Sequence, residues 1–136
     1  MKIVVLVKQV PAVSNVQLDP VTHNLVRTGA PAMLNPADLH AAEAALQIKE
    51  QAGGGTVTIL CMGSPAATEV MRECIAIGAN DGILVCDGGV RGSDTLATGK
   101  VLAKAIEKIG GVDAVFTGKK SLDGDTGQIP PAVAQR

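Results

Sequence analysis

Four short apolar runs, separated by segments with helical spacing, set the pattern of the chain. The runs are rich in β-branched residues and are nearly continuous rather than alternating. Continuous apolar runs suit strands that are covered on both faces, as in a parallel sheet. We therefore expect four buried strands, at residues 3–7, 57–61, 82–86 and 114–117.

The segments between these runs carry signals for helix starts and stops. Asn35-Pro36 and Ser64-Pro65 open the first two helices, Ser93 or Asp94 caps the third, and glycines follow each of the three. A fourth helix is expected to begin between residues 125 and 128. The expected inward faces are Ala37, Ala41, Ala44, Ala45 and Ile48 in the first helix, Val70, Met71, Cys74 and Ile75 in the second, and Leu102, Ala105, Ile106 and Ile109 in the third.

The alternation of strands and helices predicts the fold class. It indicates an α/β domain of the Rossmann-like type, with a doubly wound parallel sheet, helices on both faces and right-handed crossovers. One stretch after the first strand breaks the pattern. Its Asp19-Pro20 turn, between possible arms at residues 16–18 and 25–27, predicts a hairpin excursion. We expect residues 1–136 to form a single domain, truncated at its C-terminus because no stop signal follows the last helix.

Composition narrows the function classes. The 136-residue chain has a formal net charge of −1, with 46% hydrophobic and 18% charged residues. These values are typical of a soluble globular domain and give no attraction to nucleic acid or an anionic membrane. Phe116 is the sole aromatic residue, which argues against a platform that stacks nucleic-acid bases. The first apolar run is too short for a signal peptide or a membrane span, so we expect a cytoplasmic protein without membrane insertion.

The three cysteines predict neither a metal site nor a disulfide. Cys61, Cys74 and Cys86 stand far apart, and no pair has the spacing of metal ligands. We expect them to behave as small buried hydrophobic residues in a reducing compartment.

The richest polar segment of the chain follows the fourth expected strand. Open α/β sheets bind ligands beyond the carboxyl ends of their strands, and here those ends lead into residues 8–11, 62–64, 87–89 and 118–128. The last segment bears glycines and feeds a helix, so several backbone N–H groups can face one anion. We expect a phosphate or diphosphate near residues 124–128, with Thr126 as a hydroxyl donor. Lys119 and Lys120 either add positive charge there or are simply solvated.

Known motifs and catalytic sets are poorly represented. Residues 118–121 do not satisfy the P-loop pattern, and no Gly-x-Gly-x-x-Gly follows the first strand. His23 and His40 are isolated and are expected to be surface or half-buried residues. Asp123 and Asp125 form an acidic pair that suits helix capping or a ribose hydroxyl, whereas acid–base catalysis would need a substrate that the sequence does not identify. We therefore expect no catalytic residue; the segment is suited to holding a molecule.

Several segments resemble the beta subunits of electron transfer flavoproteins. The most specific is Gly118-Lys119-Lys120-Ser121-Leu122-Asp123-Gly124-Asp125-Thr126-Gly127-Gln128. The other similar segments are residues 5–11, 34–38, 43–50, 72–81 and 94–98, in the same order over the whole chain.

The resemblance implies an electron carrier rather than an enzyme that acts alone. In that family the beta subunit pairs with an alpha subunit that carries a redox-active FAD. The beta subunit holds a second adenine nucleotide, which is AMP in many members and FAD in members that bifurcate electrons from NADH. Residues 8–11 and 18–27 are more similar to the flavin-holding branch, so FAD is the expected cofactor and AMP the alternative. Acyl-CoA dehydrogenase-type proteins and NADH are the implied redox partners.

Carried over by position, the resemblance also implies the cofactor-binding residues. Lys8 is one of the implied cofactor-binding residues, and the others divide into an adenine side and a phosphate side. The adenine side is Leu6, Asn35, Pro36, Ala37, Asp38 and Met62, and the phosphate side is Gly118, Lys119, Lys120, Ser121, Leu122, Asp123, Gly124, Asp125, Thr126, Gly127, Gln128 and Ile129. Asn35 is alternatively only a helix cap, or serves both roles, and Met62 is alternatively a core residue at a strand end.

The sequence departs from the family at three places. Ala12 stands where such members usually carry an acidic residue, and Pro130 where they often carry glycine. Because neither Pro130 nor Pro131 has a backbone N–H, the fourth helix is expected to start late, near Gln128. The family's chains also continue well beyond Arg136.

Two other functions stay open: an ATP-binding module of the stress-protein type, and an adenylating or ATP-cleaving enzyme, for which the sequence lacks a convincing metal-binding motif.

Overall fold

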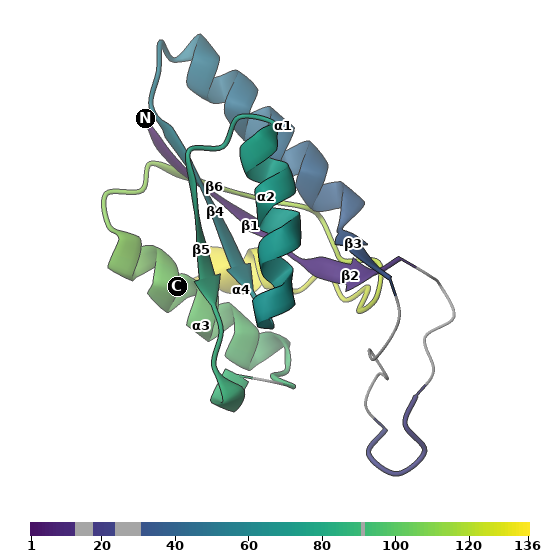
Figure 1. Ribbon diagram of the computed structural model, residues 1–136. Coiled ribbons are helices and arrows are strands. Elements are labelled where there is room, and N and C mark those ends of the chain that lie inside the picture. The colour runs from purple at the N-terminus through teal and green to yellow at the C-terminus, as the bar shows by residue number, and fades with distance from the viewer. Residues whose placement is uncertain (13–17, 24–30, 91) are drawn as a thin grey trace.

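A four-stranded parallel sheet forms the centre of the molecule (Figure 1). The computed structural model describes residues 1–12, 18–23, 31–90 and 92–136. The strands occur in the order β5-β4-β1-β6, and all three pairings are parallel. Their bounds are β1 (Lys2–Val7), β4 (Thr56–Met62), β5 (Asp81–Val85) and β6 (Ala114–Thr117). The four expected strands are confirmed.

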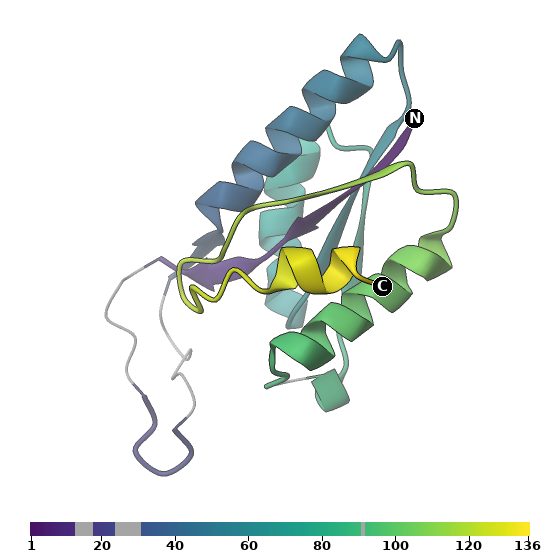
Figure 2. The same ribbon diagram turned by 180° about the vertical axis from the view of Figure 1, so that it is seen from behind.

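Helices cover both faces of this sheet (Figures 1 and 2). One face carries α1 and α2, and the other carries α3 and α4. Short 3₁₀ turns, η1 and η2, precede α2 and α3. The bounds are α1 (Pro36–Gln51), η1 (Pro65–Ala67), α2 (Thr68–Ala76), η2 (Gly88–Val90), α3 (Thr95–Ile109) and α4 (Ile129–Ala134). Asp94 caps α3 by accepting a hydrogen bond from the N–H of Ala97 at 2.8 Å.

Strand β1 supplies side chains to two separate cores because successive side chains point to opposite faces of a sheet. Ile3, Val5 and Val7 pack under α1 and α2, whereas Val4 and Leu6 pack under α3 and α4. All five are at most 6% exposed. A strand buried on both faces needs apolar side chains throughout, which explains the continuous run in the sequence.

The strand order confirms the doubly wound fold. From β1 the chain passes through α1 to β4 and through α2 to β5, moving outward on one side. It then returns through α3 to β6, which lies on the other side of β1. The connections before and after this reversal pack on opposite faces of the sheet. β1 and β6 are thus neighbours, and the chain continues from β1 to α1 on one face and from β6 to α4 on the other.

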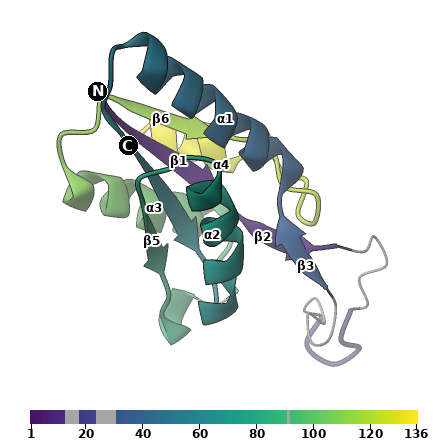
Figure 3. The same ribbon diagram turned by 45° about the horizontal axis from the view of Figure 1, so that its top comes forward.

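An antiparallel ribbon projects beyond the end of β1 (Figure 3). It pairs β2 (Gln9–Pro11) with β3 (Ala32–Leu34). The excursion expected after the first strand thus leaves and re-enters the fold through this ribbon, and the arms expected at residues 16–18 and 25–27 lie outside the described residues apart from Leu18. The expected turn is present: a carboxylate oxygen of Asp19 accepts hydrogen bonds from the N–H groups of Val21 and Thr22, both at 2.8 Å.

Three sequence expectations about burial were wrong in part. The buried face of α1 includes Asp38, Ala42 and Leu46, whereas Ala37, Ala44 and Ile48 are only half-buried. In α2, Ile75 is 42% exposed, because it lies over β5, a strand at the sheet edge. Cys61 and Cys74 are buried as expected, but Cys86 is exposed because it lies just beyond the end of that edge strand.

Replacing Ile59 with alanine tests the core under α1 and α2. Ile59 is fully buried in the central strand β4, so Ile59→Ala should lower the free energy of unfolding by about 2–5 kcal/mol through lost burial and a residual cavity. Ile83→Ala in β5 removes the same atoms from a side chain that is 39% exposed and should cost distinctly less. Urea unfolding followed by circular dichroism measures both, and equal losses would contradict the described layering.

Candidate functional site

The candidate site lies at the carboxyl ends of β1 and β6. These strands pair in parallel, from Ile3 opposite Ala114 to Leu6 opposite Thr117. Ligands of open α/β sheets bind where neighbouring strands send their chains to opposite faces, because that divergence opens a crevice. Here the diverging segments are Lys8 with the ribbon on one side, and the loop of residues 118–128 on the other.

The carboxylate of Asp38 joins the two diverging segments. One of its oxygens accepts the N–H of Lys8 at 2.9 Å, and the other accepts the N–H of Gly118 at 3.2 Å. Asp38 lies in the first turn of α1 and is 7% exposed. Its two oxygens thus serve the first amide after β1 and the first amide after β6.

Burial raises the pKa of Asp38 above the ordinary value of 3.8. Hydrogen bonds from Asn35, Lys8 and Gly118 and the charge of Lys8 act in the opposite direction, since each favours the carboxylate. The raised pKa means that this carboxylate is held at a cost in desolvation.

The side chain of Asn35 holds the loop of residues 118–128 at a second place. Its amide nitrogen donates to the carbonyl of Lys120 at 3.0 Å, and its oxygen accepts the N–H of Leu122 at 3.1 Å. Asn35 occupies the N-cap position of α1, is 1% exposed, and makes no side-chain capping bond. The expectation that it caps the helix through its side chain is therefore wrong, because both of its polar atoms bind the distant loop.

Lys8 reaches into the same loop through its ammonium group. Its Nζ forms an ion pair with Oδ1 of Asp123 at 2.7 Å and a hydrogen bond with Oγ of Ser121 at 3.3 Å. The carboxylate side chain of Asp123 is only 2% exposed. Burial alone would raise the pKa of Asp123, but Lys8, Ser121 and the N–H of Gly124 outweigh it and leave the pKa lowered. Asp123 thus closes the loop rather than facing solvent.

Part of the loop's backbone is already paired within the protein. Among residues 124–128, Gly124 donates to Asp123, Asp125 to the carbonyl of Ser121, and Gln128 to Oγ1 of Thr126. No acceptor within the described residues takes the N–H of Thr126 or Gly127. The expected phosphate donors are thus narrowed to two consecutive amides.

The two lysines of the loop differ in their pairing. Lys120 forms an ion pair with Asp125 at 2.6 Å, in which both side chains are about half exposed. Lys119 is exposed and has no ion-pair partner within the described residues. Of the two expected cations, Lys119 is the one whose charge is not neutralised by a neighbour.

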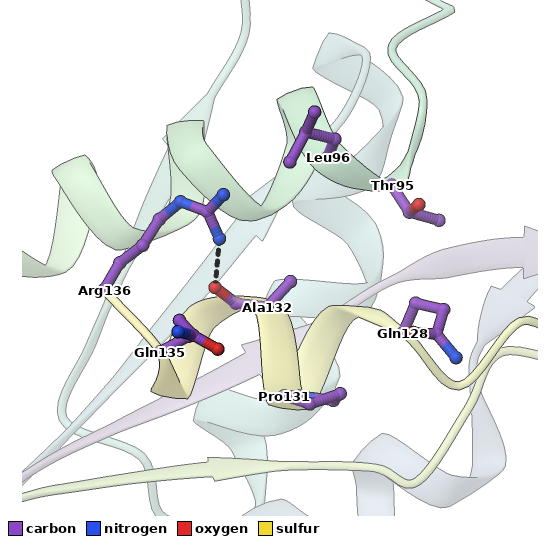
Figure 4. Close-up of a pocket in the computed structure, with 7 residues that line it drawn as sticks. All are labelled: Thr95, Leu96, Gln128, Pro131, Ala132, Gln135 and Arg136. Carbon is purple, nitrogen blue, oxygen red and sulfur yellow. Dashed lines mark hydrogen bonds between the residues drawn. The ribbon is translucent and has the colours of Figure 1, made fainter.

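An open pocket of about 480 Å³ lies between the start of α3 and α4 (Figure 4). The sequence expectation included only Gln128 among its lining residues, which are Thr95, Leu96, Gln128, Pro131, Ala132, Gln135 and Arg136. Thr95 and Leu96 belong to the family-like segment 94–98, a signal that was present in the sequence and was not carried over to the site.

The remaining expected site residues lie outside this hydrogen-bonded network. Leu6 is 6% exposed and packs in the core beneath α3 and α4, and Met62 and Ile129 pack against the same cluster. Met62 is thus half-buried at its strand end. Pro36 is exposed and Ala37 half-buried at the start of α1.

Among the described residues, no group of three or more His, Cys, Asp or Glu side chains is placed to bind a metal ion. His23 and His40 are both exposed, as expected for surface residues. In the same part of the chain, no helix has the length and apolar character needed to cross a membrane.

Taken together, the reversed strand order and the divergence of the chain after β1 and β6 define a Rossmann-like α/β protein. A family model described as "Electron transfer flavoprotein domain" matches residues 22–136, and the chain belongs to that family. It is 47% identical to Protein FixA of Azotobacter vinelandii, over 98% of this chain and 48% of that protein. It is 46% identical to "Electron transfer flavoprotein subunit beta" of Thermoanaerobacterium thermosaccharolyticum, over 100% of this chain and 52% of that protein. A third relative, "Caffeyl-CoA reductase-Etf complex subunit CarD" of Acetobacterium woodii, is 45% identical with the same coverage.

The chain spans about half the length of the curated relatives that it matches. Family membership confirms the resemblance that the sequence motifs indicated. The family is one of flavoproteins, as its name states.

Replacing Gly118 with alanine tests the close approach between β6 and α1. A Cβ at this position would overlap Oδ1 of Asp38 and lie 2.8 Å from backbone and side-chain carbons of Ala37. Gly118→Ala should therefore lower the free energy of unfolding by about 1–3 kcal/mol, the usual cost of overpacking. Gly88→Ala is the matched control, since a Cβ there meets no atom within 4 Å. Thermal and urea unfolding measure both, and a neutral Gly118→Ala would contradict the described contact.

The ion pair between Lys8 and Asp123 predicts a pH dependence of stability. Because the pKa of Asp123 is lower in the folded state than its ordinary 3.8, the unfolded state binds more protons as the pH falls. The stabilisation is complete well above pH 3.8 and is lost as the pH falls through the lowered pKa.

Lys8→Met should lower the free energy of unfolding at pH 7 by about 1–3 kcal/mol, because a buried carboxylate loses its cationic partner. Its stability curve should also fall less steeply between about pH 5 and pH 3. Lys104→Met removes an exposed ion pair with Glu107 and should change neither quantity measurably. Identical acid slopes for Lys8→Met and the unchanged protein would refute the role of the pair.

Proposed function

We propose that this chain holds an adenine nucleotide at the switch point between β1 and β6, as part of an electron-carrying flavoprotein subunit of the beta type. The observation that supports this proposal is the loop of residues 118–128, which is fixed by Lys8, Asn35 and Asp38. Two of its amides have no acceptor within the described residues. A preformed loop with unpaired N–H groups is suited to an anion, because binding then requires little free energy to order the loop.

The residues present fit the phosphate part of such a nucleotide. The N–H groups of Thr126 and Gly127 are free within the described residues, and the hydroxyl of Thr126 lies beside them on an exposed loop. Gly127 has φ +63°, a left-handed conformation that turns its amide without a steric penalty from a side chain. Lys119 supplies an unneutralised positive charge. Pro130 and Pro131 contribute no N–H, so the loop rather than the first turn of α4 provides the donors.

The neighbouring surface fits the rest of the ligand. The start of α1, with Pro36 and Ala37, adjoins the loop at Gly118 and is the proposed adenine side. The pocket beside α4 adds Thr95, Leu96 and Gln128 to the set inferred from sequence. FAD is the proposed ligand and AMP the alternative.

The chemistry of the site is that of a carrier. When bound, FAD supplies two-electron redox chemistry, and the protein positions it and sets its electrostatic surroundings. The residues of this chain bind and orient: Thr126 and Gly127 hold phosphate, Lys119 neutralises charge, and Lys8 with Asp123 keeps the loop closed. We further propose that the protein works with an alpha-type subunit in the cytoplasm and exchanges electrons with NADH or an acyl-CoA dehydrogenase-type partner.

The identity of the nucleotide is the sharpest test. The protein is co-expressed with its partner subunit, the complex is denatured, and the released nucleotides are separated by chromatography and quantified. FAD at two equivalents per complex, with bleaching of the flavin absorbance by NADH, is the expected result. One FAD and one AMP would support the AMP alternative and remove the proposed exchange with NADH at this site. A colourless protein that releases ATP would instead identify the nucleotide-sensing module.

Replacing Gly127 with alanine locates the phosphate. Gly127→Ala strains a backbone at φ +63° that presents one of the two free amides, and should weaken FAD binding roughly tenfold, in line with a strain of about 1–2 kcal/mol. Gly53→Ala is the matched control: Gly53 has φ +78°, meets no atom within 4 Å of a Cβ, and lies at the far end of α1. Isothermal titration with FAD measures both variants. Equal affinities for the two would move the phosphate away from Gly127.

A further inference from the structure

At the start of α1, the side chains at the two capping positions bind distant groups instead of the first turn of the helix. In a capping box, the N-cap side chain accepts an N–H of the first turn, and the residue three positions later reaches back to the N-cap amide. Asn35 and Asp38 hold these two positions. Pro36 needs no acceptor, and the carbonyl of Asn35 accepts the N–H groups of Asp38 and Leu39 at 2.9 and 3.2 Å. The helix start is therefore closed largely by its own backbone.

This leaves both side chains available for distant partners. The bonds of Asn35 span 85 and 87 residues, and those of Asp38 span 30 and 80. Their partners are the first amides after β1 and β6 and two groups of the loop after β6. Both side chains are nearly fully buried, at 1% and 7% exposure, and all four of their terminal polar atoms are bonded within the protein.

We propose that Asn35 and Asp38 are positioning residues that set the distance between the base side and the phosphate side of the site, and that their side chains do not contact the nucleotide. This proposal rests on the proposed function and assigns these two residues a role different from the ligand contact that the family resemblance implies. They form a bracket, which we define as the four hydrogen bonds from Asn35 and Asp38 to Lys8, Gly118, Lys120 and Leu122.

The bracket acts on the ligand through the loop. Asn35 holds the carbonyl of Lys120 and the amide of Leu122, which lie just before the turn that ends in the free amides of Thr126 and Gly127. Asp38 holds Gly118, where the loop begins, to Lys8, where β1 ends. Loss of either side chain frees one side of the site relative to the other, so affinity falls although no ligand contact is removed.

Asn35→Ala, Asp38→Ala and Asp38→Asn test the proposal in the full chain. The first readout needs no ligand: amide hydrogen exchange of Leu122 and Gly118. Asn35→Ala should accelerate exchange at Leu122, and Asp38→Ala at Gly118, each by about fivefold or more, as expected for the loss of one net hydrogen bond. Asp38→Asn keeps one acceptor oxygen and the same volume, so it should fall between Asp38→Ala and the unchanged protein. It also keeps the test open if the alanine variant does not fold.

The second readout is affinity for FAD, with AMP measured in parallel. Asn35→Ala and Asp38→Ala should each weaken binding roughly tenfold, with the Asp38→Asn variant intermediate.

Asn80→Ala and Asp113→Ala are the matched controls. The side chain of Asn80 accepts the N–H of Val57 at 2.8 Å, and that of Asp113 accepts the N–H of Lys2 at 2.7 Å, both at the amino ends of strands. They remove bonds of the same kind at the opposite end of the sheet, and should leave affinity for FAD unchanged even where stability falls.

Each combination of outcomes decides the matter. Faster exchange and weaker binding in the bracket variants, with normal binding in the controls, supports the proposal. Weaker binding without faster exchange means that the side chains contact the nucleotide, and faster exchange with normal binding means that the bracket does not position the site; either overturns it. An equal loss of affinity in the controls reduces the effect to general stability and also overturns it. If the unchanged protein binds neither FAD nor AMP, the proposed function fails, while the exchange data still show whether the bracket exists.

Discussion

The arrangement of this protein depends on one buried carboxylate. A parallel sheet opens a crevice only where two adjacent strands diverge, and divergence leaves their first following amides without strand partners. Asp38 accepts both of these amides, from Lys8 and Gly118, from the first turn of α1. Desolvation opposes the charge, and the hydrogen bonds offset part of that cost. The two strands thus diverge while the backbone donors that follow them are satisfied.

Other side chains near the ends of β1 and β6 also bind groups that are distant in the sequence. Asn35 serves the loop after β6 in place of its own helix, and Lys8 binds a carboxylate of that loop that is almost fully buried. Glycine at position 118 allows the loop to approach α1 closely enough for these bonds. Three side chains from the end of β1 and the start of α1 therefore hold a segment that lies 80 or more residues away in the sequence.

A loop that is held in place by side chains of β1 and α1 suits a protein that carries a redox cofactor. Electron transfer needs a cofactor held in a fixed position, while the chemistry belongs to the cofactor itself. Some polar groups around the ends of β1 and β6 are bonded within the protein, whereas the amides of Thr126 and Gly127 and the charge of Lys119 have no partner within the described residues. Membership of the electron transfer flavoprotein domain family agrees with a site that binds without a catalytic set.

Local patterns in the sequence determined the elements of the fold and the location of the site. Apolar runs marked the four strands, Asn35-Pro36 and Asp94 marked the starts of α1 and α3, and strand ends marked the loop of residues 118–128. Ser64-Pro65, expected to open the second helix, opens a 3₁₀ turn instead, and α2 begins at Thr68. These signals are local because they depend on side-chain periodicity and on backbone preferences of neighbouring residues.

Only the tertiary structure decided how the polar residues are used. Whether Asn35 caps its helix or binds the loop depends on which strand lies beside β1, and the sequence does not encode that in any short segment. The exposure of Ile75 and Cys86 likewise follows from the place of β5 at the sheet edge. The physical reason is the same in each case: a side chain's partner is fixed by contacts between residues far apart in the chain, which local propensity does not specify.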